Sequence, residues 1–83
     1  MKQIEFETHI KASNIQEVVV DSYGLSEAWM LTIFFKTLLP AAIHTARGEV
    51  KTFAQIDSAL RFVRECGWTG SVRIATHVNT KGA

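Results

Sequence analysis

Residues 45–68, TARGEVKTFAQIDSALRFVRECGW, decide the fold of this chain, because they contain a turn and a helix whose boundaries are both marked. Arg47-Gly48 fits the two-residue loop of a β-hairpin, in which glycine supplies a positive φ. A loop of this length places His44 directly opposite Lys51. The segment therefore predicts two short antiparallel strands that bring these two side chains together on one face of a sheet.

An amphipathic helix is predicted after the hairpin. Thr52 and Gln55 have the spacing of a capping box, in which the threonine hydroxyl accepts a hydrogen bond from the Gln55 amide. Gly67 stands where a left-handed C-cap belongs. The apolar side chains between these points recur at helical spacing: Ile56, Ala59, Leu60, Val63 and Cys66. Residues 71–78, SVRIATHV, then predict a closing strand.

Two strands are predicted at the start of the chain. Residues 3–12, QIEFETHIKA, alternate between apolar and polar side chains, which is typical of a half-buried strand. Ser13-Asn14 is a turn signal. Residues 15–22, IQEVVVDS, contain three consecutive valines and favour a second strand. The two strands are expected to form a hairpin.

Residues 27–39 predict the first helix, with Ser26 as its N-cap and a proline after its last residue. A wide apolar stripe lies along one side of this helix, yet Trp29 and Ile33 fall on the opposite side, where a surface helix should be polar. The alternative is a strand over residues 30–35, MLTIFF, because β-branched and aromatic residues favour strands.

These elements predict one domain over residues 1–83, of the α+β class. The expected order is β-β-α-β-β-α-β, with two helices packed on one face of an antiparallel sheet. The single cysteine, Cys66, excludes an internal disulfide and fits the reducing cytoplasm. The first residues lack the apolar core of a signal peptide. The apolar run AWMLTIFFKTLL is too short to cross a bilayer.

Catalysis and metal binding find no support in the residue pattern, so we expect a protein that is not an enzyme and holds no cofactor or metal. The three histidines and one cysteine do not have the spacing of a zinc site. The five glycines are scattered, so they do not form a phosphate-binding loop. No small-molecule substrate is indicated.

The predicted interface lies on the second side of the first helix. Trp29 and Ile33 have the composition of an interface hot spot, and Lys36 and Thr37 lie beside them. A small domain without disulfides or metals gains stability from a partner, and a homodimer is the simplest form. The first hypothesis is therefore a non-enzymatic interaction module that forms a homo-oligomer or binds a protein partner.

The alternative hypothesis is a small nucleic-acid-binding accessory protein. The net charge is only +1, which is not the excess expected of a dedicated binder. The basic residues nevertheless gather after residue 28. The predicted anion or nucleic-acid contacts are His44, Arg47, Lys51, Arg61, Arg64, Arg73 and His77.

The pattern ARGE…TF…D.A…FVRE.GW within residues 45–68 resembles small accessory proteins of plasmids and integrating elements, some of them partition-associated. The resemblance implies a bacterial mobile-element protein that acts through protein contacts. It carries over no catalytic residue. Turn, cap and helix positions make up most of the shared pattern.

Overall fold

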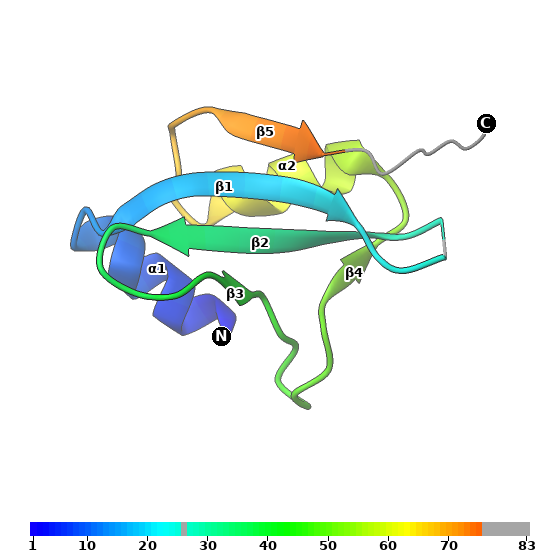
Figure 1. Ribbon diagram of the computed structural model, residues 1–83, viewed down its shortest axis with the longest axis horizontal. Helices are drawn as coiled ribbons and strands as arrows, with labels where there is room; N and C mark the ends of the chain where they lie inside the picture. The colour runs from blue at the N-terminus through cyan, green and yellow to red at the C-terminus, as the bar shows by residue number, and fades with distance from the viewer. Residues whose placement is uncertain (26, 76–83) are drawn as a thin grey trace.

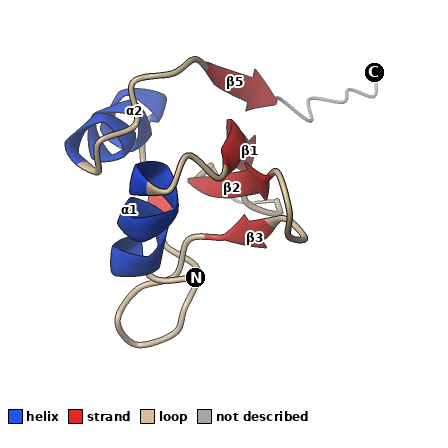
Figure 2. Cartoon of the chain, turned by 90° about the vertical axis from the view of Figure 1, so that its left-hand side faces the viewer, coloured by secondary structure: helices blue, strands red, loops and turns tan. Residues whose placement is uncertain are grey.

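The computed structural model describes residues 1–25 and 27–75, and the sequence prediction of an α+β class is confirmed. Both helices lie on one face of the sheet, as expected (Figure 2). The order is α-β-β-β-β-α-β, so the predicted order is wrong in its first half. The elements, drawn in Figure 1, are α1 (Gln3–Lys11), β1 (Ile15–Ser22), β2 (Trp29–Phe35), β3 (Ala41–Ala42), β4 (Thr52–Phe53), α2 (Ile56–Glu65) and β5 (Val72–Ala75).

The sheet is mixed rather than antiparallel throughout. Its strands lie in the order β3-β2-β1-β5, and β4 also pairs with β2. The β1–β2 pair is antiparallel, with Val18 opposite Ile33. The β1–β5 pair is parallel, with Val18 beside Val72. Helix α2 lies between β4 and β5 in the chain and forms the crossover that carries the chain from β4 to β5, on the other side of the sheet.

Within residues 3–12, where a strand was predicted, Gln3–Lys11 form helix α1 and Ala12 is its C-cap. An alternating pattern also places Phe6 and Ile10 one helical turn apart, and both side chains pack against the core. The carboxylate of Glu5 accepts a hydrogen bond from the Lys2 N–H at 2.8 Å, which satisfies a donor at the helix start. The strand prediction was wrong because an alternating sequence also has apolar residues four positions apart, and this spacing fits one face of a helix as well as one face of a strand.

The turn signal at Ser13-Asn14 ends α1 instead of joining two strands. Ser13 has a φ of 58°, in the left-handed region. The Ser13 N–H donates to the Ile10 carbonyl and the Asn14 N–H donates to the His9 carbonyl, both at 3.0 Å, which is a Schellman ending. Gly67 follows α2 with a φ of 107°, so the prediction of a left-handed glycine there is confirmed.

Residues 29–35 form strand β2, so the prediction of a helix over residues 27–39 is wrong and its strand alternative is confirmed. β2 is an inner strand that pairs with β1 on one side and with β3 and β4 on the other. When the residues of a strand that is apolar on both faces are plotted as a helix, apolar side chains lie on all sides of that helix. This is why Trp29 and Ile33 seemed to lie on a second helical side.

The hairpin around Arg47-Gly48 forms, but its register differs from the prediction by one residue. His44 pairs with Val50 rather than with Lys51. The Thr45 N–H donates to the Glu49 carbonyl at 2.7 Å, so the loop has three residues. The shift means that His44 and Lys51 are no longer directly opposite each other, although both line the hollow described below.

Helix α2 begins later than predicted, with Gln55 as its N-cap, because Thr52 is part of strand β4. Its predicted apolar face is confirmed: Ala59, Val63 and Cys66 are buried, and Ile56 and Leu60 pack against the core. The largest fully buried side chains come from α1, from β1 and β2, from the residue after β3 and from α2: Phe6, Leu31, Ile33, Ile43, Val18, Val20 and Val63. The core therefore lies between the helices and one face of the sheet.

Candidate functional site

The opposite face of the sheet carries no helix or strand within residues 1–25 and 27–75, and it faces the viewer in Figure 1. We call it the open face. Strand alternation and the pairing registers assign its residues, because residues that are paired across strands share a face. They are Glu17, Val19, Asp21, Met30, Thr32, Phe34, Ala42, Thr52, Arg73 and Ala75.

The middle of the open face is uncharged. β2 contributes Met30, Thr32 and Phe34, all half-buried, and Val19 beside Thr32 is only 3% exposed. When one face of a sheet is solvated, the side chains on that face are normally polar. This face therefore has the composition of a contact surface rather than of a fully hydrated one.

One ion pair on the open face joins the edge strand β5 to the inner strand β1. Arg73 Nε on β5 donates to the Glu17 carboxylate on β1 at 2.6 Å, and the two side chains are 55% and 37% exposed. The hydrogen bond from Arg73 lowers the pKa of Glu17, and the same bond raises the pKa of Arg73. Both groups therefore stay charged at neutral pH and neutralise each other.

β5 is the end strand of the sheet on this side (Figure 1). The register of Ile74 beside Val20 places it on the helix-facing side of the sheet. Val20 is fully buried there, yet Ile74 remains 43% exposed. An edge strand lacks a neighbour on its outer side, so an apolar side chain on it stays in contact with water.

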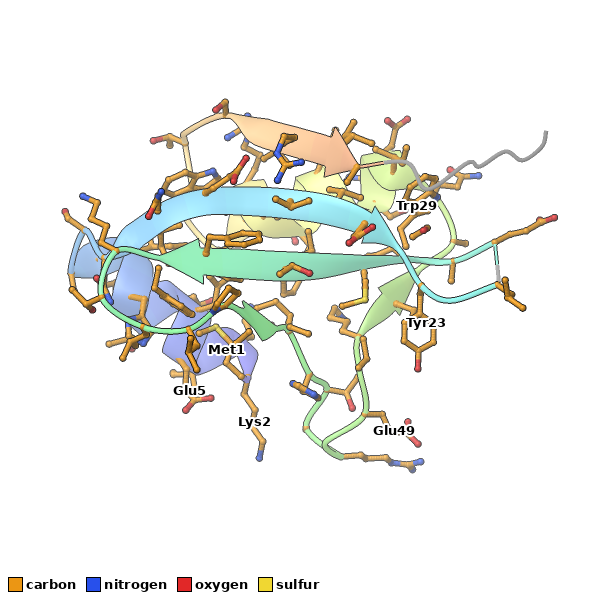
Figure 3. The ribbon with its side chains drawn as sticks, in the orientation of Figure 1. Met1, Lys2, Glu5, Tyr23, Trp29 and Glu49 are labelled. Atoms are coloured by element: carbon orange, nitrogen blue, oxygen red, sulfur yellow. The ribbon has the colours of Figure 1, made fainter. Side chains whose placement is uncertain are left out.

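The predicted interface residues do not form one surface. Ile33 is 0% exposed and belongs to the core, so it offers no surface for contact with a partner. Trp29 is half-buried and packs against the core at the β4 side of the sheet (Figure 3). Lys36 and Thr37 lie in the exposed loop after β2, where the Thr37 hydroxyl donates to the Asn14 side chain at 3.1 Å.

Three of the predicted basic contacts are engaged within the fold. Arg73 pairs with Glu17, as described above. The Arg64 guanidinium donates to the carbonyls of Trp68 and Gly70 at 2.9 and 2.8 Å and holds the loop between α2 and β5. The ammonium of Lys51 lies 5.1–5.4 Å from the ring centroids of Phe53 and Phe62, a cation–π geometry.

The other basic residues stand apart. Arg47 is exposed at the hairpin tip, and Arg61 is exposed on α2. His77 lies outside the described residues. His44 lies near the chain start, with its Nδ1 3.0 Å from the amino group of Met1. The structure therefore does not gather the predicted cationic patch on one face.

A hollow of about 290 Å³ lies between the start of α1 and the 43–51 hairpin. Its lining is Lys2, Gln3, Ile4, His44, Thr45, Ala46 and Lys51. Among the described lining residues there is no carboxylate or thiol that could act as a nucleophile, and the Lys51 ammonium is near the two phenylalanine rings. Within residues 1–25 and 27–75, no group of three or more His, Cys, Asp or Glu side chains could hold a metal ion.

Cys66 is a buried thiol at the end of α2. Burial is the main cause that raises its pKa to about 11, and the nearby carboxylates of Glu7 and Glu65 raise it further. A thiol with this pKa is protonated at neutral pH and is a poor nucleophile.

The described helices include none that is both long and apolar enough to cross a membrane.

The sequence did carry a signal for the open face. Leu31, Ile33 and Phe35 alternate with Met30, Thr32 and Phe34, and a strand assignment of this run would have separated the two faces.

The chain matches no protein-family model, and no curated protein or solved structure is significantly similar to it.

Proposed function

We propose that this chain is a non-enzymatic protein-interaction module that forms a homodimer through its sheet. The observation that carries the proposal is that described elements leave two parts of the sheet uncovered: the open face, whose strand β2 has no charged residue on this side, and the outer edge of β5. The sheet, and not a helix side, therefore replaces the predicted Trp29 and Ile33 surface as the region of contact. The helices would remain on the outside of the assembly.

The alternative function, binding of nucleic acid, receives less support from the geometry. Phosphate recognition needs free cations along one surface. Lys51, Arg64 and Arg73 are held by partners within the chain instead. The resemblance of residues 45–68 to plasmid and integrating-element proteins adds a bacterial mobile-element setting to the proposal, and the single cysteine adds the cytoplasm.

Sedimentation velocity over a wide concentration range tests the proposal, combined with amide hydrogen exchange. We expect the mass to rise from monomer to dimer between roughly 10 µM and 1 mM. Exchange should slow with concentration in peptides from β1, β2 or β5 and stay constant in the exposed side of α2. A monomer at about 1 mM, or protection confined to the helices, would refute the proposal.

A further inference from the structure

We propose that two copies pair along strand β5, antiparallel, so that their sheets join into one. This inference rests on the proposed function, because it names which part of the sheet makes the contact. β5 ends the sheet on one side, and no described element lies beyond it. Its outer backbone N–H and C=O groups can therefore pair with a second strand.

Edge pairing is favoured over stacking of two open faces by the Glu17–Arg73 ion pair. Stacking would take both charges out of water, and this costs several kcal/mol per ion unless new partners are supplied. It would also gain little from Val19, which is already 3% exposed. Pairing along β5 leaves the ion pair hydrated.

The ion pair also removes the usual protection of an edge strand. Charged side chains on an edge prevent it from pairing with other chains. Arg73 is the charged residue within β5, and its guanidinium points across to β1, where Glu17 neutralises it. The edge is then left with Val72, Ile74 and Ala75, which favour or tolerate strand pairing.

The charges and the exposed isoleucine select the register. Residues that face each other across an antiparallel pair must share a sheet face, and a dyad beside Arg73 or beside Ile74 gives the longest overlap of the two strands. The first choice sets two arginines opposite each other, and because Glu17 already pairs with each of them, this contact adds no favourable charge interaction. The second places Ile74 against Ile74 of the other copy, where each side chain covers the other.

This arrangement has a defined geometry. A two-fold axis that relates antiparallel edge strands stands perpendicular to the sheet, so it keeps the helices of both copies on the same side. The two open faces then form one continuous surface on the opposite side. A contact along four residues falls short of the roughly 1,200 Å² of a standard interface, so the dimer should dissociate readily on dilution.

Two substitutions on the sheet separate this inference from the proposed function. Ile74→Lys puts two ammonium groups opposite each other. We therefore expect the dissociation constant of the dimer to rise by about tenfold or more. Thr32→Lys puts the same charge in the middle of the open face, two strands away, and should leave the mass distribution unchanged. Circular dichroism confirms that both variants fold.

Disulfide trapping tests the register in a Cys66→Ala background, where the introduced thiol is alone. Ile74→Cys should form a covalent dimer rapidly, because facing Cβ atoms lie about 4.5–5.5 Å apart. Ser71→Cys, equally exposed but away from the dyad, should form it slowly. Equal rates for the two variants would overturn the inference.

The remaining outcomes are distinct. A dimer that Thr32→Lys breaks and Ile74→Lys does not would overturn edge pairing and leave the proposed function intact. A wild-type chain that stays monomeric at about 1 mM would overturn both.

Discussion

Substitution of Ile33 tests whether this residue belongs to the core or to a partner surface. Ile33 lies on the inner strand β2 opposite Val18, with no exposed surface. Ile33→Val removes one buried methylene and is expected to lower the free energy of unfolding by about 0.5–1.5 kcal/mol. Ile33→Ala removes more and leaves a cavity, so its expected cost is about 2–5 kcal/mol.

These costs are large for this chain. A domain of 83 residues has a free energy of unfolding of about 4–12 kcal/mol at the usual value per residue. Ile33→Ala therefore removes a major part of the total and can unfold the protein at moderate temperature. Ile33→Val keeps it folded, which makes the smaller substitution the quantitative test.

Urea unfolding followed by circular dichroism measures the effect. With a slope of roughly 1–2 kcal/mol per molar urea, Ile33→Val should lower the midpoint by about 0.25–1.5 M. Lys36→Ala is the matched control, because this side chain is exposed three residues further along and should change the stability by less than about 0.5 kcal/mol. Equal midpoints for the two variants, with an altered mass only for Ile33→Val, would refute the placement of Ile33 in the core.

Three further measurements probe the C-terminal end of α2 and the open face. Gly67→Ala should lower the free energy of unfolding by about 1–2 kcal/mol through backbone strain alone, since φ is +107° and nothing lies within 4 Å of the added Cβ; an unchanged thermal midpoint would contradict this. Iodoacetamide at pH 8 should modify Cys66 at least about 100-fold more slowly than a free thiol, because the pKa is raised from 9.0 to about 11; mass spectrometry should show fast labelling only in urea. The Glu17–Arg73 ion pair stabilises the fold above the pKa that the Glu17 carboxyl has in the unfolded chain, and this contribution is lost as the pH falls through the lower pKa that Glu17 has in the folded protein. Arg73→Gln should therefore raise the pKa of Glu17 in an NMR titration. An unchanged pKa would show that the pair does not form in solution.

The parts of the fold that the sequence predicted are those where local pattern and tertiary environment agree. Strand β1 occupies residues 15–22 as predicted, because three consecutive valines suit a strand that is paired on both sides. Helix α2 presents its predicted apolar face, and Gly67 ends it. These signals are short-range, so they do not depend on knowing the rest of the sheet.

The first half failed where two periods fit the same residues. Phe6 and Ile10 fit a strand face and a helix face equally well, and contact with the core selects the helix. The run over residues 30–35 fits a helix stripe and an inner strand, and pairing with β1 selects the strand. The open face was missed because it follows only from the strand alternative for residues 30–35 and not from the helix that was preferred.

The parallel pairing of β1 with β5 has a consequence for the order in which the chain folds. The β1–β2 hairpin closes a short connection, an event that takes microseconds in isolated hairpins. β5 reaches β1 only after β3, β4 and α2 have been traversed, so its closure carries the higher entropic cost and is expected to come late. Until then β1 presents one whole side without a neighbour, and it is this half-finished sheet, rather than the native one, that would begin aggregation.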